Sequence, residues 1–443
     1  MDLQQYIKDK YDSASDWFVT FVNEVHNQRR VQDVMAKKEY LNGNHAILQK
    51  ASYKYKGKEF VPRKIVLQYA KTLLNFQKAY LLQNTITLTG NEKIVKKYQQ
   101  VNRKGKYNRL NQKILDKVLK YGQVAEYVYM ENGTIKSKLI DPSEGYPVYD
   151  HNNNLIAYIQ AFMSDGIEYY TVYEPKYVSE YDNKGGELRL VGRYNNLSGL
   201  PIIYHNQNEL NEVEGRSELD DWISILDNME DLISKYTDSF YKFMNPIPVS
   251  IGQEIKGDGL SSDVVGGGIS LDDGSDFKLE SNGLDYHTFE TLFKTLLQSL
   301  LDTSQTPAVS MNKTDISNLS EVSIKLLFQL ANIKAAGNEL FMRDGIEQRF
   351  EKIRTLLGYK NIKFSDDDFD SLDIVFQYAM PSNDKEIIEM LKELRDMGAI
   401  SLESLLSHSP MTSDVQMELN KIMSEGNNST VSTDGKDKID TVE

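Results

Sequence analysis

The sequence predicts an α+β protein that is mainly helical, and three stretches carry this prediction. Apolar residues recur about every 3.5 residues in two helices within 217–302, a period typical of helices that pack along a seam. A third, proline-free helix runs from about 319 to 357. Between 124 and 194, apolar and polar residues alternate in short runs separated by turn signals, which indicates an antiparallel sheet.

The composition fits a soluble protein of several domains. The chain has 443 residues, 40% of them hydrophobic and 26% charged, and this length predicts two to four domains. It contains no Cys, which excludes disulfides and a thiol nucleophile. The N-terminus lacks a signal-peptide pattern, and no apolar run approaches the roughly 18 residues that span a bilayer. We therefore expect a cytoplasm-like setting and no membrane contact.

Charge is distributed unevenly along the chain. The net charge of −14 argues against a domain that grips DNA phosphates tightly. Residues 364–443 hold 18 acidic and 6 basic side chains, a net charge of −12. Residues 91–120, by contrast, hold ten Lys or Arg side chains against Glu92 and Asp116. We interpret this basic segment as a solvated helix face, with a contact to acidic neighbouring subunits as the alternative.

The N-terminal part is predicted to be helical. Residues 2–40 form helices that end at the breaking sequence 42–44. Residues 51–61 are polar and rich in lysine, which predicts an exposed loop. Pro62 is expected to open the next helix, because proline is favoured in a first helical turn. Residues 91–121 predict two basic helices on either side of Gly105.

Strands are predicted from Val124 onward, with Asn132-Gly133 as a hairpin turn. Further strands are expected at 136–140, 147–149, 155–163, 167–173, 177–181 and 188–194. Residues 1–215 are therefore expected to form one α+β domain.

The two seam helices have recognisable ends. The first begins at Ser217, which can cap its first turn, and ends at 245–246, because the residue before a proline is disfavoured in a helix. The second starts near Asp285 and stops at 306–307. The third helix would span roughly 55–60 Å at 1.5 Å per residue, with Gly358 as its C-terminal cap.

Loops and a short C-terminal region complete the prediction. Residues 246–284 contain eight glycines and two strand-like pieces, 249–251 and 277–279, which suggests a small α/β or β tip. Residues 303–318 form a second loop. After Gly358 we expect a strand at 373–378, helices at 383–397, 401–406 and 412–424, and a disordered acidic tail at 425–443.

No pattern predicts an enzyme, a cofactor or a metal site. The triple glycine at 266–268 lacks the Lys-Ser or Lys-Thr that a phosphate loop requires. The acidic runs at 272–276 and 366–370 lack the spacing of a calcium loop, which favours solvated loops over weak metal binding. The histidines are scattered, and His45 and His205 are interpreted as structural.

A collinear set of short motifs is more specific than any one of them. In chain order these are YLNGNHAIL at 40–48, LPIIYHN at 200–206, EGRSEL at 214–219, NP at 245–246, QTPAVS at 305–310 and SEVSIK at 320–325. In this order and spacing, over roughly 30–400, the chain resembles the portal proteins of tailed bacteriophages, of the type found in long-tailed phages of Gram-positive hosts.

The resemblance implies a mainly helical portal fold with an antiparallel β wing, a two-helix stem, a small α/β clip and a helical crown. The parts would be the wing at 1–216, the stem helices at 217–244 and 285–302, the clip at 245–284, the tunnel loop at 303–318, the long wing or spine helix at 319–358, the crown at 359–424 and the tail at 425–443.

The resemblance also implies a function. The chain would form a homo-oligomeric ring, expected to be a dodecamer, at a unique capsid vertex of the virion, after assembly in the bacterial host cytoplasm. Double-stranded DNA would pass through the ring during packaging and ejection. Expected partners are the terminase large subunit, the head-completion or connector protein, and the major capsid and scaffolding proteins. The alternative is a cytosolic coiled-coil scaffold or adaptor, which gives no role to the loop at 303–318.

Three residue sets follow from these expectations. Apolar residues off the seam require a second packing neighbour, so the first stem helix is expected to form the subunit interface. The predicted interface residues are Trp222, Ile223, Ile225, Leu232, Tyr236 and Phe240. The same helix has an acidic face that would repel DNA phosphates from the channel wall. The predicted channel-lining residues are Asp220, Asp221, Asp227, Glu230, Asp231 and Asp238.

The tunnel loop is expected to approach the duplex through Met311, Asn312, Lys313, Thr314 and Asp315, with Lys313 as its only basic residue.

Overall fold

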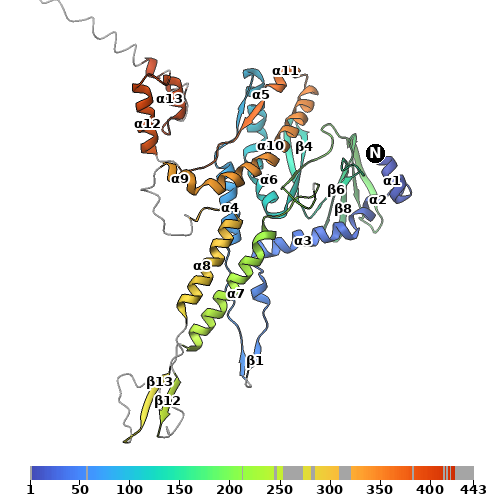
Figure 1. Ribbon diagram of the computed structural model, residues 1–443. Helices are drawn as coiled ribbons and strands as arrows, with labels where there is room; N and C mark the ends of the chain where they lie inside the picture. The colour runs from blue at the N-terminus through green and yellow to red at the C-terminus, as the bar shows by residue number, and fades with distance from the viewer. Residues whose placement is uncertain are drawn as a thin grey trace, which may run out of the picture. The chain divides into compact units, whose positions relative to one another are not determined.

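The computed structural model confirms the α+β class with mostly helical content (Figure 1). It describes residues 2–55, 58–211, 213–243, 247–252, 273–280, 285–308, 321–381, 384–412, 415, 418–419 and 421–424. The chain divides into two compact units. The first contains Met1–Thr306 and Ala331–Ala379, and the second contains Pro307–Leu330 and Met380–Glu443.

The N-terminal part is helical, as predicted, and contains α1 (Leu3–Tyr11), α2 (Trp17–Val22) and α3 (Val25–Asn42). Apolar residues of α1 and α2, such as Trp17 and Phe18, share a core with strand residues Ile159 and Val172. Helix α3 ends where Gly43 adopts a φ of 104°, a left-handed conformation that glycine tolerates without strain. A short 3-10 helix, η1 (Ala46–Gln49), follows.

The region after η1 departs from the prediction. The expected loop at 51–61 contains an antiparallel strand pair, β1 (Tyr53–Tyr55) and β2 (Lys58–Phe60). Helix α4 (Tyr69–Leu82) begins seven residues after Pro62, not at it. The backbone N–H groups of Ile65 and Leu67 instead donate to side chains of a distant helix, which holds this segment outside a helix.

The basic helices are confirmed as α5 (Glu92–Gly105) and α6 (Tyr107–Tyr121). Most of their cationic side chains are exposed, as a solvated face requires. Two cations near the end of α6 bind carboxylates, Lys117 to Asp141 at 2.8 Å and Lys120 to Asp116 at 2.7 Å. A small strand pair joins β3 (Thr87–Thr89) to β14 (Asp373–Val375), a shorter strand than predicted.

All the strands predicted after residue 123 are present, but they form two antiparallel sheets. The five-stranded sheet has the order β10-β9-β8-β7-β6, and the three-stranded sheet has the order β11-β4-β5. Their bounds are β4 (Gln123–Glu131), β5 (Thr134–Ile140), β6 (Gly145–Tyr149), β7 (Leu155–Ser164), β8 (Ile167–Tyr173), β9 (Tyr177–Asp182), β10 (Arg189–Asn195) and β11 (Ile202–His205). The last strand, β11, was not predicted.

The two seam helices are confirmed as α7 (Leu219–Phe243) and α8 (Tyr286–Thr303), which pack side by side (Figure 1). Asp285 caps α8 by accepting a hydrogen bond from the Thr288 backbone N–H at 3.0 Å. In the described part of the glycine-rich insert, the two predicted strands are present as β12 (Ile247–Ile251) and β13 (Asp276–Glu280), and they pair with each other.

The prediction of one helix over 319–357 is wrong. The described residues form α9 (Glu321–Leu327) and α10 (Gln329–Gly358), with Phe328 between them. Neither proline nor glycine marks this break, so the sequence pattern gave no sign of it. Gly358 is the last residue of α10.

The remaining helices are α11 (Asp366–Asp370), α12 (Asp384–Asp396) and α13 (Leu402–His408), and the described residues within 415–424 are helical. No helix among the described residues is long and apolar enough to cross a membrane. The predicted tail at 425–443 lies outside the described residues.

Candidate ring and channel site

The first half of α7 is embedded in its own subunit. Its seam residues Leu219, Trp222, Leu226 and Met229 are buried, and Trp222 is only 1% exposed. A side chain already buried within one subunit has no surface left for a second one. The assignment of Trp222 to the subunit interface is therefore wrong, and this residue belongs to the core.

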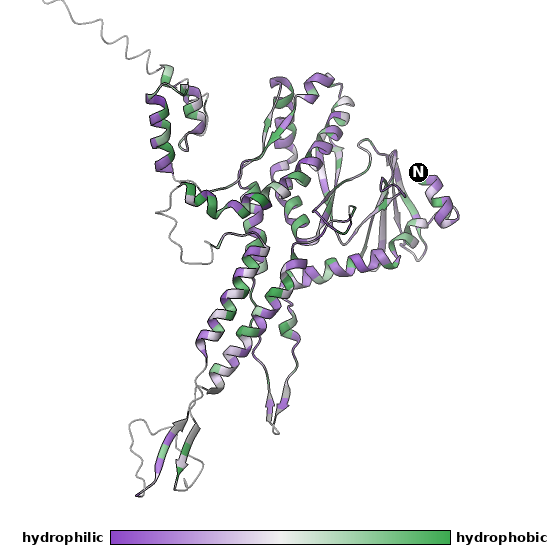
Figure 2. Ribbon diagram, viewed as in Figure 1, coloured by the Kyte–Doolittle hydropathy of each residue, from purple (hydrophilic) through white to green (hydrophobic). Residues whose placement is uncertain are grey.

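The second half of α7 pairs with α8 and leaves apolar surface uncovered. The rings of Tyr236 and Phe289 stack, with centroids 3.9 Å apart and an interplanar angle of 17°. Beyond this pair Phe240 is 48% exposed, and Leu292 on α8 has the same exposure. Hydrophobic residues continue along both helices (Figure 2). The other predicted interface residues, Ile223, Ile225 and Leu232, are half-buried.

The acidic face of α7 is covered by basic residues of the same chain. Three carboxylates on this face bind cations from residues 37–63, which run alongside the helix. These ion pairs are Lys37 with Asp220 at 2.8 Å, Lys50 with Asp231, and Arg63 with Asp238 at 3.8 Å. The Arg63 backbone N–H also donates to Asp238 at 3.1 Å. Near the start of α7, Asp221 pairs with Arg216.

Glu230 lies inside the subunit and cannot line a channel, which corrects its predicted role. Its Oε1 atom lies 2.6 Å from His45 Nδ1 and accepts a hydrogen bond from the Leu67 N–H at 2.8 Å. Both side chains of the pair are almost fully buried, at 0% and 1% exposure. Burial raises the pKa of Glu230, although its contacts with Leu67 and His45 oppose the shift. The structural role predicted for His45 is thus confirmed.

Further polar groups surround this pair. The Tyr40 ring stacks on His45 with centroids 3.9 Å apart. Burial raises the pKa of Asp227, and it also raises that of Tyr40, with the nearby carboxylates adding to the shift on Tyr40. Within this group of residues, four buried atoms have no hydrogen-bond partner in the described protein: Tyr40 Oη, His45 Nε2, Asp227 Oδ1 and Glu230 Oε2. We name Tyr40, His45, Asp227 and Glu230 the stem-junction cluster.

The outward face of α8 carries a row of uncharged polar side chains next to the exposed Lys294. Thr288, Thr291, Thr295 and Gln298 follow one another at helical spacing and are exposed.

Only the first residues of the predicted tunnel loop are described. Ser304 and Thr306 are buried, and the Gln77 side-chain amide donates to the Ser304 carbonyl at 3.0 Å, which anchors the end of α8 to α4. Met311, Asn312, Lys313, Thr314 and Asp315 lie outside the described residues.

A second buried charged network, which the sequence did not reveal, ties α10 to the sheet. Arg349 donates to Glu126 at 2.9 Å, to Asn111 at 2.8 Å and to the Tyr204 hydroxyl at 2.9 Å. The one sequence feature that could have indicated this network is an arginine among the apolar residues of a long helix. Among the described residues, no group of three or more His, Asp or Glu side chains is arranged to hold a metal ion.

Comparison with known proteins identifies the family. The profile described as "Phage portal protein, SPP1 Gp6-like" matches residues 23–431. No curated protein matches the sequence.

Solved structures with a similar chain include three from gene transfer agent (GTA) particles, each at 10% sequence identity. A chain of the native GTA virion has a TM-score of 0.45 and an alignment that covers 76% of this chain and 88% of that one. A chain from the neck of the empty particle, computed with C6 symmetry, has a TM-score of 0.48 with coverages of 75% and 86%. A chain from the neck of the native particle, computed with C12 symmetry, has a TM-score of 0.46 with coverages of 76% and 89%.

The profile match includes both stem helices, both sheets and the long helix, and it confirms the resemblance that the short motifs indicated. The chain belongs to the SPP1 Gp6-like family of phage portal proteins, which form a ring at a capsid vertex.

Proposed function

We propose that the chain forms a closed ring of twelve copies whose central channel carries double-stranded DNA during packaging and ejection. The family match over 23–431 is the observation that carries this proposal. It also argues against the alternative of a cytosolic scaffold without a DNA conduit. The protein would act as a structural component of the virion rather than as an enzyme.

Helix α7 would supply a surface for the neighbouring copy along its whole length. Ile223, Ile225, Leu232 and Tyr236 are half-buried, and Phe240 is exposed, so an isolated subunit leaves this apolar area in water. Burial of apolar side chains contributes roughly 1.5–3 kcal/mol for each fully buried residue. Repetition of the contact around a ring would bury this surface in every copy.

The channel wall would combine weakly acidic and neutral surface. The carboxylates that keep some exposure are Asp220, Asp221, Asp227, Asp231 and Asp238. Because several are paired with cations, the wall would repel phosphates less than six free carboxylates would. The hydroxyl and amide face of α8 would add contacts that do not hold the duplex.

The tunnel loop would provide the closest approach to DNA. One Lys313 in each copy would form a ring of positive charge that holds DNA transiently. We propose further that the terminase large subunit and the head-completion protein dock on the clip, and that the ring contacts capsid and scaffolding proteins after its assembly in the bacterial cytoplasm.

One experiment tests the conduit. The variant Asp221→Lys with Asp231→Lys should form rings, visible by native mass spectrometry, and these rings should bind duplex DNA with an affinity that falls steeply with salt. The unaltered ring should bind DNA weakly. In packaging assays, Lys313→Ala should retain less DNA per capsid although its rings remain intact. A wild-type chain that stays monomeric at micromolar concentration would contradict the proposed function.

A further inference from the structure

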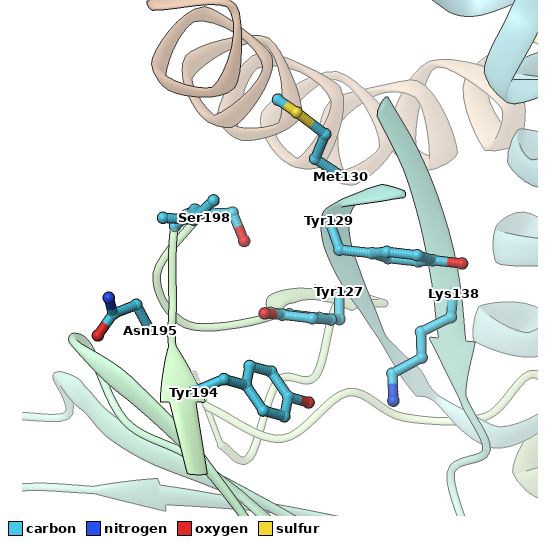
Figure 3. A pocket seen from close by; sticks show the side chains of 8 residues that line it. Tyr127, Tyr129, Met130, Lys138, Tyr194, Asn195 and Ser198 are labelled. Carbon is cyan, nitrogen blue, oxygen red and sulfur yellow. The ribbon is translucent and has the colours of Figure 1, made fainter. Parts of the chain in front are cut away.

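An aromatic pocket opens between the two sheets of the first unit. Its volume is about 270 Å³. Tyr127 and Tyr129 of β4, Tyr194 of β10 and Leu197 of the β10–β11 connection contribute to its lining. Figure 3 shows the tyrosine rings around a common space toward which the Lys138 ammonium group points. The Tyr127 hydroxyl donates to Asn196 and the Tyr194 hydroxyl donates to Glu180, each at 3.1 Å, so both rings are fixed in place.

Lys138 supplies the positive charge of this pocket. Its Nζ lies over the rings of Tyr127 and Tyr173, 5.8 and 5.4 Å from their centroids, and Glu180 acts on it electrostatically, although the described residues show no direct ion pair between the two side chains. Partial burial lowers the pKa of Lys138, with Glu180 opposing the shift. The pocket thus suits an apolar side chain that stands next to a carboxylate.

Tyr194 and Leu197 line the pocket and are exposed, and further apolar residues of β10 lie nearby in the sequence. Strand β10 is the last strand of its sheet, with β9 as its neighbour on one side. Its residues Leu190, Val191 and Tyr194 are exposed, and so is Leu197 just beyond it. Exposed apolar patches of this kind mark interaction sites in soluble proteins.

An apolar side chain next to a carboxylate, which would complement the pocket, projects from another part of the same unit. Leu210 is 92% exposed, more than any other large apolar side chain of the described residues, and the exposed Glu209 precedes it. Side chains hold the described part of this loop: Asn208 accepts a hydrogen bond from the Leu210 N–H at 3.0 Å and donates to the Glu214 carbonyl at 2.8 Å. These bonds hold the backbone at Leu210 while its side chain stays in solvent.

The projection and the pocket lie at opposite ends of the three-stranded sheet. The loop follows His205, which pairs with Gln123 at the start of β4, whereas the pocket begins at Tyr127 and extends to Met130. At about 3.4 Å per residue these ends are roughly 20 Å apart, so one subunit cannot fill its own pocket. A closed ring requires two different complementary patches on each subunit.

We infer that Leu210 and Glu209 of one subunit dock into the Tyr127–Tyr194 pocket of the next, with Glu209 paired to Lys138. This inference rests on the proposed ring and adds a contact outside the stem. The occupant is a second copy of this chain, because its loop supplies both the apolar side chain and the carboxylate that the pocket matches.

Engineered cysteines test the contact directly, since the natural chain has none. Leu210→Cys combined with Leu197→Cys should form intersubunit disulfides and give a covalent ladder up to the full ring on a non-reducing gel. The matched control is Leu210→Cys combined with Met163→Cys, because Met163 is 67% exposed but does not line the pocket. This control should give no ladder.

Charge exchange gives an independent readout. Glu209→Lys and Lys138→Glu should each raise the concentration needed for half-assembly about tenfold, and the double variant should restore it. Leu210→Ser should raise this concentration about ten- to a hundredfold. If intact rings form but give neither crosslinks nor rescue by the double charge variant, the inference is wrong and the proposed function still stands. The same conclusion follows if the pocket binds another protein instead. A wild-type chain that forms no ring would overturn both.

Discussion

Two buried charged clusters hold long helices of this protein in place, and they differ in how completely their polar atoms are paired. Arg349 on α10 is 1% exposed, and its guanidinium donates to a carboxylate, an amide and a hydroxyl. The Tyr204 hydroxyl in turn donates to Glu126 at 2.7 Å. Each of these partners lies on an element of the three-stranded sheet or on α6. This network therefore fixes α10 against a rigid surface.

The stem-junction cluster on α7 is less complete. Its central pair, His45 and Glu230, is as deeply buried, yet each residue has one polar atom without a partner in the described protein. Unpaired buried polar atoms carry an energetic penalty, whereas fully paired networks rigidify a core. We conclude that α10 is rigidly anchored, whereas the anchoring of α7 is weaker and more sensitive to pH.

The largest effect is expected when the complete network loses one member. Arg349→Met leaves Glu126 buried without its cation, which should lower the free energy of unfolding by about 3–5 kcal/mol. Urea unfolding at a fixed protein concentration measures this loss. The double variant Glu126→Leu with Arg349→Met removes both charges and should recover part of the stability. Equal losses in the two variants would show that the charge pairing is not the source of the effect.

A smaller effect is expected at the stem-junction cluster. Glu230→Ala removes the acceptor for His45 and for the Leu67 N–H. This change should lower the free energy of unfolding by about 1–3 kcal/mol. Glu230→Gln keeps an acceptor oxygen and removes a charge that burial disfavours, so its cost should be lower. Hydrogen exchange of the peptide covering 61–68 should accelerate in the alanine variant and change little in the glutamine variant. Slow exchange in both would mean that Glu230 does not anchor this segment.

The pH dependence should separate a carboxylate with a raised pKa from one with a lowered pKa. Burial raises the pKa of Glu230 in the folded protein. Its contribution to the free energy of unfolding is therefore fully present below the pKa of the unfolded chain, about 4.3, and is lost as pH rises through the raised pKa of the folded protein. Burial also acts on Asp141, but hydrogen bonds from Lys117 and Lys38 outweigh it and hold the pKa of Asp141 well below its usual range. The contribution of Asp141 to the free energy of unfolding is present above the pKa of the unfolded chain, about 3.9, and is lost as pH falls below that value.

Melting temperatures across pH 3–8 check these signs. As pH falls from 8 through the raised pKa of Glu230, the wild type should gain stability relative to Glu230→Gln, and below pH 4 it should lose stability relative to Asp141→Asn. Parallel pH profiles for the wild type and both variants would contradict the assignments.

The smallest effect is expected on the surface of the stem. Lys50 and Asp231 are both partly exposed, and Lys235 also contacts Asp231 at 2.7 Å. Lys50→Met should therefore change the free energy of unfolding by at most about 1 kcal/mol. A larger loss, measured by the same urea titration, would show that the cations along α7 act as one coupled network.

Local patterns in the sequence were sufficient to predict most helices and strands. Asn132-Gly133 forms the turn between β4 and β5, with φ values of 48° and 70°, and Asp285 caps α8. Turn and cap chemistry depends on neighbouring residues, so it can be read from sequence. The collinear motifs were likewise sufficient to indicate the portal family, because their order does not depend on how the chain folds.

Tertiary structure decided what each face of these elements contacts. The sequence showed an acidic face on α7, but Lys37, Lys50 and Arg63, which cover it, are separated from their partners by more than 170 residues. The same long-range packing placed Trp222 in the core, kept Pro62 outside a helix, and buried Arg349 beside Glu126. Periodicity reports that a helix has an apolar or a charged face, whereas the partner of that face depends on contacts between residues distant in the chain.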